Sequence, residues 1–275
     1  MLKKQDWGYN LKLKAAILDM YKGFPNQGMG NIKDILTKCD VDWKVYDIRV
    51  KSEVPKLNNY DLIVSTGGPD SPYEGQDTWQ KLYGNLLDEL IEFNQNNSKK
   101  KYAFLICHSF QMAVTHFGLG HIKERNSTAF GIFPVHKTDY SEKTELFKDL
   151  KSPIFAVDSR DWQMVEPNAL RFQEMDAKIL FLEKIRPNVK KERAVMGIQF
   201  TPEIIGTQFH PEADAKGMKY YFSQEEKMEG IIKAHGYKKY TRVMSRLEHE
   251  DKLPYTQDNF IPKLISYIKK EYNYD

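Results

Sequence analysis

Apolar and polar residues alternate along the first half of the chain in blocks that predict strands and helices in turn. Residues 13–19, 43–48, 60–65 and 102–106 are rich in apolar and β-branched side chains, which is typical of buried strands. Helical spacing appears between them, in residues 32–38 and in five further apolar positions: Leu82, Leu86, Leu87, Leu90 and Phe93. Because strands and helices alternate, the pattern predicts an α/β fold with a mostly parallel, open sheet flanked by helices.

The middle of the chain is richer in short strands. Apolar segments at residues 130–135, 154–157 and 178–182 predict three of them. Residues 197–203 (Gly-Ile-Gln-Phe-Thr-Pro-Glu) and 206–212 (Gly-Thr-Gln-Phe-His-Pro-Glu) are nearly the same string. We interpret these two segments as adjacent strands of a hairpin.

The last part of the chain is helical in character. It contains three helical stretches and three breaks: residues 224–234, 241–248 and 260–270, with Gly236, Pro254 and Pro262 between or within them. We therefore expect residues 1–216 to form the α/β domain and residues 217–275 to form a helical C-terminal extension packed on the core. A docking surface for a partner or for a second copy of the chain is the alternative use of this extension.

A cysteine stands at the junction of a predicted strand and a predicted helix. Cys107 ends the apolar run 102–106 and is followed at once by His108 and a helical stretch. A thiol attacks as the thiolate, and the unpaired N–H groups and the positive dipole end of a helix N-terminus favour that form. Cys107 is a candidate nucleophile; taken alone, a small buried hydrophobe is its plainer interpretation. Cys39 has no such surroundings and is interpreted as structural.

A histidine and a carboxylate follow the second copy of the repeated string. His210 and Glu212 lie two residues apart, whereas the first copy has Thr201 at the position of the histidine and offers no base. A histidine near a thiol can take its proton and later return it to a leaving amine, while a carboxylate holds the ring in the required tautomer. Together Cys107, His210 and Glu212 indicate an acyl-transfer site.

A glycine-rich turn after the strand 60–65 completes the set. Residues 66–69 read Thr-Gly-Gly-Pro, and glycines allow backbone N–H groups to point at a developing oxyanion without a side chain in the way. The N–H of His108, the residue after the nucleophile, is the expected second donor.

These three segments resemble the class I glutamine amidotransferases. The matching residues are Gly-Gly-Pro at 67–69, Cys-His-Ser-Phe-Gln at 107–111 and Gln-Phe-His-Pro-Glu at 208–212, in the family's order and within residues 12–215. The resemblance implies a flavodoxin-like layered α/β fold and hydrolysis of the glutamine side-chain amide through a γ-glutamyl thioester on Cys107. It also implies oxyanion donors at Gly68 and His108 and a substrate-pocket role for Gln111. The ammonia would pass to an acceptor or to a separate synthetase.

The chain departs from the family pattern at three positions. The elbow usually has small residues two before and two after the cysteine, where this chain has Leu105 and Ser109. Arg160 stands where the family commonly has a histidine, and a guanidinium binds carboxylates in bidentate fashion. Two alternatives therefore stay open. One is a stand-alone γ-glutamyl hydrolase or transferase whose larger substrate meets Arg160, and the other is a non-catalytic scaffold with a degenerate elbow.

Composition limits the cellular compartments, partners and cofactors that this chain could have. The 275 residues carry a net charge of +3, which implies no broad basic field for nucleic acid. The first residues lack the apolar stretch of a signal peptide, no apolar run approaches the ~20 residues that span a bilayer, and a reactive thiol suits a reducing compartment. The spacing of the histidines favours no metal site, and no cofactor motif is complete. We expect a cytoplasmic enzyme without a cofactor or a membrane partner, acting on a small-molecule substrate.

Overall fold

The computed structural model describes residues 12–69, 71–72, 77–185 and 193–274. Its strands form one sheet in the order β2-β1-β3-β4-β9-β8-β6-β5-β7. The strand bounds are β1 Leu13–Asp19, β2 Val41–Asp47, β3 Leu62–Ser65, β4 Tyr102–Ile106, β5 His121–Lys137, β6 Ile154–Val165, β7 Lys178–Glu183, β8 Val195–Thr201 and β9 Ile204–Thr207.

The two halves of this sheet differ in strand direction. Strands β2, β1, β3, β4 and β9 pair in parallel. Strands β9, β8, β6, β5 and β7 pair antiparallel, and β7 also pairs with β8, so this half closes on itself like a small barrel. The prediction of an α/β fold is confirmed, but the prediction of a mostly parallel, open sheet is wrong for the second half.

Connection length explains the difference. A parallel pair needs a crossover of a dozen or more residues, usually a helix. Only residues 202–203 separate β8 from β9, so this pair must be an antiparallel hairpin, as the repeated string predicts. The predicted short strands at 130–135 and 154–157 are parts of the longer strands β5 and β6, which pair along most of their length.

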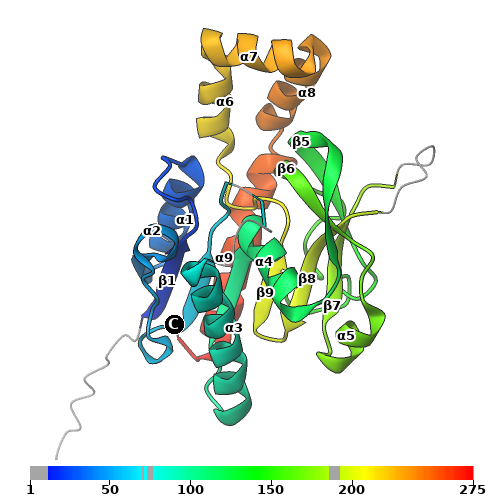
Figure 1. The fold of residues 1–275 in the computed structure, drawn as a ribbon. Coiled ribbons are helices and arrows are strands. Elements are labelled where there is room, and N and C mark those ends of the chain that lie inside the picture. The colour runs from blue at the N-terminus through cyan, green and yellow to red at the C-terminus, as the bar shows by residue number, and fades with distance from the viewer. Residues whose placement is uncertain (1–11, 70, 73–76, 186–192, 275) are drawn as a thin grey trace, which may run out of the picture.

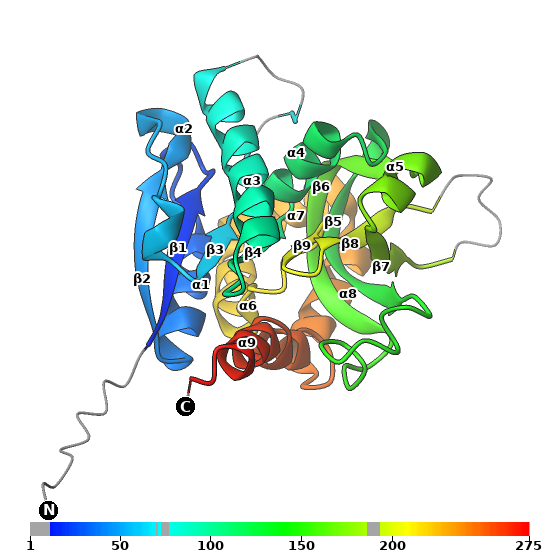
Figure 2. The ribbon, with the colours of Figure 1, turned by 90° about the horizontal axis from the view of Figure 1, so that it is seen from below.

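Helices cover both faces of the parallel half (Figure 2). Helices α3 and α4 pack on one face with side chains of β1, β3 and β4, while α1 and α9 pack on the other. The helix bounds are α1 Gln27–Lys38, α2 Ile48–Lys51, α3 Thr78–Asn96, α4 His108–Phe117, α5 Ala169–Glu174, α6 Ala215–Ser223, α7 Glu225–His235, α8 Tyr237–Glu248 and α9 Leu253–Glu271; a 3-10 turn spans Leu57–Asn59.

Several helix boundaries differ from the sequence prediction. Helix α8 begins at Tyr237 rather than at residue 241, and α9 begins at Leu253 rather than at residue 260. Pro254 and Pro262, predicted as breaks, lie within α9: Pro254 is in its first turn, where a missing N–H costs no helical hydrogen bond, and Pro262 is in its interior.

Helix α1 begins at Gln27 rather than at residue 32, because Asn26 caps it by accepting a hydrogen bond from the Gly28 N–H. Gly28 and Gly30 therefore lie inside the helix and not in a turn before it. Helix α6, which the pattern did not predict, begins after Asp214, whose side chain accepts from two backbone N–H groups of the first turn.

The C-terminal helices serve two different parts of the molecule. Helices α6, α7 and α8 project from one end of it (Figure 1). Their apolar side chains, among them Phe222 and Val243, form a small cluster with Ile132 of β5. Helix α9 instead joins the main core, where Phe260 contacts Phe104 and Phe209. None of the helices in the described ranges is long and apolar enough to cross a membrane.

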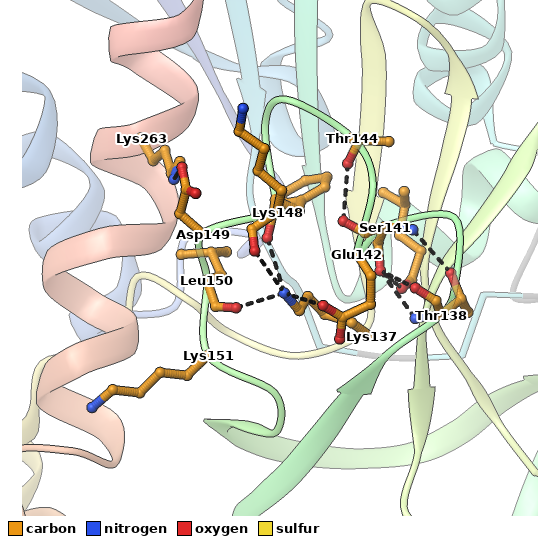
Figure 3. A network of polar contacts seen from close by, with 12 residues as sticks. Lys137, Thr138, Ser141, Glu142, Thr144, Lys148, Asp149, Leu150, Lys151 and Lys263 are labelled. Carbon is orange, nitrogen blue, oxygen red and sulfur yellow. Dashed lines mark hydrogen bonds and ion pairs between the residues drawn. The ribbon is translucent and has the colours of Figure 1, made fainter.

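A buried lysine fastens the loop between β5 and β6 (Figure 3). Lys137 is 1% exposed at its side chain, and its Nζ donates to the carbonyl oxygens of Phe147, Lys148 and Leu150 at 3.2, 3.2 and 2.6 Å. It also pairs with Glu142 at 2.8 Å. The ammonium thereby satisfies backbone acceptors that this irregular loop leaves without strand partners.

Candidate active site

Cys107 occupies a strained turn between β4 and α4. Its backbone has φ 51° and ψ −98°, a conformation that non-glycine residues rarely adopt, and its N–H donates to the Thr207 carbonyl at 2.7 Å. The side chain is 7% exposed. Such strain persists only where the surrounding structure imposes it, and it is a feature of functional sites.

His210 and Glu212 form the second part of the site. The His210 N–H donates to the Val157 carbonyl at 2.9 Å, which holds the residue beside β6. Nδ1 of His210 lies 2.7 Å from Oε1 of Glu212, whose side chain is 1% exposed. The carboxylate therefore keeps the proton on Nδ1 and leaves Nε2 for proton exchange.

Electrostatics favour the protonated form of His210. Burial lowers the pKa of its imidazole, but the charges of Glu212 and Cys107 and the hydrogen bonds to both outweigh burial and raise this pKa well above its ordinary value. The imidazolium of His210 thus lies between Cys107 and Glu212, with hydrogen bonds to both side chains. This is the arrangement that activates a cysteine for attack on a carbonyl.

A pair of buried glutamines lies beside the thiol. Nε2 of Gln208 is 3.6 Å from Sγ of Cys107, and Oε1 of Gln208 accepts from Nε2 of Gln111 at 2.9 Å. Gln111 also donates to the Trp162 carbonyl at 3.3 Å. The family resemblance implied that Gln111 contacts the substrate. In the structure Gln111 binds Gln208, and it is Gln208 whose amide contacts the thiol. The sequence assigned Gln208 no separate role.

The glycine turn after β3 lies beside Cys107 and His210. A Cβ on Gly67 would be 2.8 Å from Cε1 of His210 and 3.6 Å from Cβ of Cys107, so Gly67 faces both catalytic candidates. A Cβ on Gly68 would be 2.4 Å from the Met20 carbonyl oxygen. Both positions require glycine because another backbone or side chain occupies the space of a side chain.

The two departures in the elbow are accommodated by their neighbours. Leu105 is fully buried and is paired in the sheet with Ser65 on one side and Gly206 on the other, both of which are small. The Ser109 hydroxyl contacts that of Ser65 at 2.7 Å and donates to the Thr66 carbonyl. The elbow keeps its strained geometry with these residues present, and Ser109 joins it to the strand of the glycine turn.

Arg160 is buried near the site, with its guanidinium turned toward protein groups. Its Nε donates to Oδ1 of Asp158 at 2.7 Å, Nη1 to the Trp162 carbonyl at 3.2 Å, and Nη2 to Sδ of Met196 at 3.3 Å. Asp158 follows Val157, whose carbonyl holds His210. A substrate carboxylate would have to compete with Asp158 for this arginine.

Tyr21 is a site residue that the sequence did not reveal. Its hydroxyl is buried, and burial together with the charges of Glu212 and Cys107 raises the pKa of the phenol well above its ordinary value. A Cβ on Gly28 would be 2.6 Å from this hydroxyl and 3.2 Å from Oε1 of Glu212. The first turn of α1 therefore packs against Tyr21 and Glu212. No spacing rule in the sequence links Tyr21 with Glu212, because they are far apart in the chain.

Known proteins resemble this chain in sequence and in fold. A family model described as glutamine amidotransferase class-I matches residues 16–227. A glutamine amidotransferase from Thermotoga maritima superposes with a TM-score of 0.68 at 17% identity, covering 95% of this chain and 98% of the other. No curated protein matches the sequence.

Two other solved structures are similar in fold. A putative GMP synthase subunit from Thermoplasma acidophilum has a TM-score of 0.56 at 20% identity, over 74% of this chain and 86% of the other. The CTPS glutaminase domain of Trypanosoma brucei, with bound acivicin, has a TM-score of 0.57 at 11% identity, over 96% and 95%. At these identities the likeness concerns the fold.

Proposed function

Because the chain belongs to the class I glutamine amidotransferase family, we propose that it hydrolyses the side-chain amide of glutamine through a γ-glutamyl thioester on Cys107. The observation that carries this proposal is the contact of three groups: a strained Cys107, a His210 whose pKa is raised, and a buried Glu212 that orients the imidazole. Of these, the raised pKa of His210 favours the imidazolium, which is the proton donor that loss of ammonia requires.

The first half of the reaction forms the thioester. The Cys107 thiolate attacks the amide carbon, and the carbonyl oxygen becomes an oxyanion that accepts hydrogen bonds from the N–H groups of Gly68 and His108. The tetrahedral intermediate collapses, the C–N bond breaks, and His210 gives its Nε2 proton to the nitrogen, which leaves as ammonia. In the second half, neutral His210 takes a proton from water, the hydroxide attacks the thioester, and glutamate leaves as the thiolate and imidazolium return.

The buried polar groups around the triad hold the substrate and the sulfur. Gln208 donates toward Sγ of Cys107, which stabilises the thiolate, and Gln111 fixes the orientation of Gln208. We place Gln111 in the wall of the substrate pocket and assign Arg160 to keeping Asp158 in position beside His210; a substrate carboxylate would reach Arg160 by competing with Asp158.

The ammonia needs an acceptor. Among the structures of similar fold, one is a putative component of GMP synthase and another is a glutaminase domain. We therefore propose that a separate synthetase, or another ammonia acceptor, uses the product of this chain.

Covalent labelling tests the proposal directly. Purified protein is incubated with acivicin, and adducts are counted by intact mass for wild type, Cys107→Ala and Cys39→Ala. We expect one adduct on wild type and on Cys39→Ala and none on Cys107→Ala, together with release of ammonia from glutamine by wild type. Cys39 is the matched control because it is the other cysteine of the chain and lies at the end of α1.

Two other outcomes distinguish the alternatives. If Cys107 reacts with iodoacetamide but not with acivicin, and γ-glutamyl peptides are cleaved while glutamine is not, the protein is a γ-glutamyl hydrolase. If no γ-glutamyl amide is turned over, the catalytic proposal is refuted in favour of a non-catalytic role.

A further inference from the structure

The short helix α2 holds an arginine against the glycine turn. Nη1 of Arg49 donates to the Pro69 carbonyl at 3.0 Å and to the Met20 carbonyl at 3.2 Å. The carbonyl oxygen of Met20 is also the atom nearest to the Cβ position of Gly68. One guanidinium therefore connects Met20, the residue that follows β1, with Pro69, the residue that follows the proposed oxyanion donor Gly68.

Two ring contacts connect this arginine with the elbow. The guanidinium carbon of Arg49 lies 4.6 Å from the ring centroid of Trp79, at the start of α3. Trp79 is 7% exposed, and its ring centroid is 6.2 Å from that of His108 with an interplanar angle of 31°. His108 carries the second proposed donor, so these contacts connect the residue after one proposed donor with the residue that carries the other.

We propose that Arg49 and Trp79 are positioning residues that set the separation and orientation of the two oxyanion donors. The inference rests on the proposed function for the donor roles of Gly68 and His108. An oxyanion hole works because its donors are fixed before the charge develops, so that no reorganisation is needed during the reaction.

The chemistry of arginine suits this task. Pro69 has no N–H, so it can form a backbone hydrogen bond only through its carbonyl oxygen. A side-chain donor such as arginine can bind that oxygen. A planar guanidinium can donate in its plane to two carbonyls and stack its face on an indole at the same time, which a lysine cannot do. Replacement by lysine should therefore restore one hydrogen bond without the stack.

The experiment separates donor positioning from thiol activation. Variants Arg49→Met, Arg49→Lys and Trp79→Leu are compared with wild type in steady-state hydrolysis of L-γ-glutamyl-p-nitroanilide and in alkylation of Cys107 by iodoacetamide. Alkylation needs the thiolate but no oxyanion hole. We expect Arg49→Met and Trp79→Leu to lower kcat by roughly 10- to 100-fold, near the lower range seen on loss of an oxyanion donor, with KM and the alkylation rate within about twofold of wild type.

Hydrogen–deuterium exchange of the peptide spanning residues 62–69 provides a readout that does not need turnover. We expect faster exchange in Arg49→Met, an intermediate rate in Arg49→Lys, and the wild-type rate in Arg171→Met. Arg171, on α5, is the matched control because its guanidinium also donates to a backbone carbonyl: its Nε lies 3.1 Å from the Phe117 carbonyl oxygen.

The outcomes are distinct. Unchanged exchange in Arg49→Met overturns the proposal whether or not the enzyme is active. Equal losses of kcat and of the alkylation rate also overturn it, because they indicate general damage to the site. If wild type turns over no γ-glutamyl amide, the proposed function fails, while the exchange comparison still decides whether Arg49 holds the turn.

Discussion

Replacing Gly67 with alanine tests whether His210 and Cys107 meet where the structure places them. The alanine Cβ would stand 2.8 Å from Cε1 of His210, whereas ordinary contacts begin near 3.4 Å, so the imidazole must move by about 0.6 Å, the difference between these distances. The Gly67 backbone lies outside the left-handed region, so the effect comes from the side chain and not from backbone strain.

The imidazole has little freedom to move without losing its partners. Its backbone N–H is bonded to Val157 and its Nδ1 to the buried Glu212. A shift therefore weakens either the contact with Glu212 or that with Cys107. Since a misplacement of about 1 Å can lower a rate by about 100-fold, we expect Gly67→Ala to lower kcat/KM by roughly 10- to 100-fold.

The assay follows both catalysis and the thiolate. Hydrolysis of L-γ-glutamyl-p-nitroanilide gives kcat/KM, and the pH dependence of Cys107 alkylation reports the pairing with His210. Gly30→Ala is the matched control: its Cβ meets nothing within 4 Å, and alanine stabilises a helix interior by about 0.8–1 kcal/mol relative to glycine. If Gly67→Ala keeps the wild-type kcat/KM and alkylation profile, His210 does not lie against Gly67 in the working enzyme, and the proposed triad geometry is wrong.

Three further predictions concern the surroundings of the triad and the fold. In Glu212→Gln, burial of His210 is no longer outweighed by the carboxylate, so its pKa falls; the alkaline limb of kcat/KM, where the imidazolium is lost, should move to lower pH, as a pH–rate profile will show. Gly28→Ala should reduce activity because its Cβ meets the Tyr21 hydroxyl and Glu212, whereas Gly30→Ala in the same helix should not, and kinetics of the two variants decide this. Lys137→Met removes a hydrogen-bond donor from three carbonyls, of which that of Phe147 keeps the Leu150 N–H, and should lower the free energy of unfolding by roughly 2–4 kcal/mol in urea titrations. The exposed Lys143→Met serves as its control, and an equal loss in both would refute the role of the buried ammonium.

The parts of this fold that follow from local pattern were predictable. Buried parallel strands read as continuous apolar runs, and the ends of neighbouring strands must meet at one edge of the sheet. That reasoning brings Cys107, Gly68 and His210 together without knowledge of the structure. The hairpin of β8 and β9 was also predictable, because the two copies of the repeated string, 197–203 and 206–212, lie too close in sequence for a crossover helix between them.

The closure of the second half of the sheet was not predictable in this way. It depends on β7 pairing with both β5 and β8. The alternation of apolar residues shows which face of a strand is buried, but not which strand it pairs with. The supporting residues of the site have the same property. Tyr21, Arg49 and Trp79 contact segments far away in sequence, and the local sequence around each is that of an ordinary loop or helix.

The elbow shows how a family pattern can change while its geometry persists. A tight turn at Cys107 needs small volumes where backbone segments converge, and the usual solution puts them on the elbow strand itself. Here the elbow strand carries Leu105, and the small residues stand beside it as Ser65 and Gly206. A Cβ on Gly206 would lie 2.9 Å from Phe110 and 3.3 Å from the Leu105 carbonyl, so this position on the neighbouring strand requires glycine. The larger side chain of Leu105 on β4 is thus offset by small residues on β3 and β9. This is why the departures at Leu105 and Ser109 are compatible with the strained conformation of Cys107.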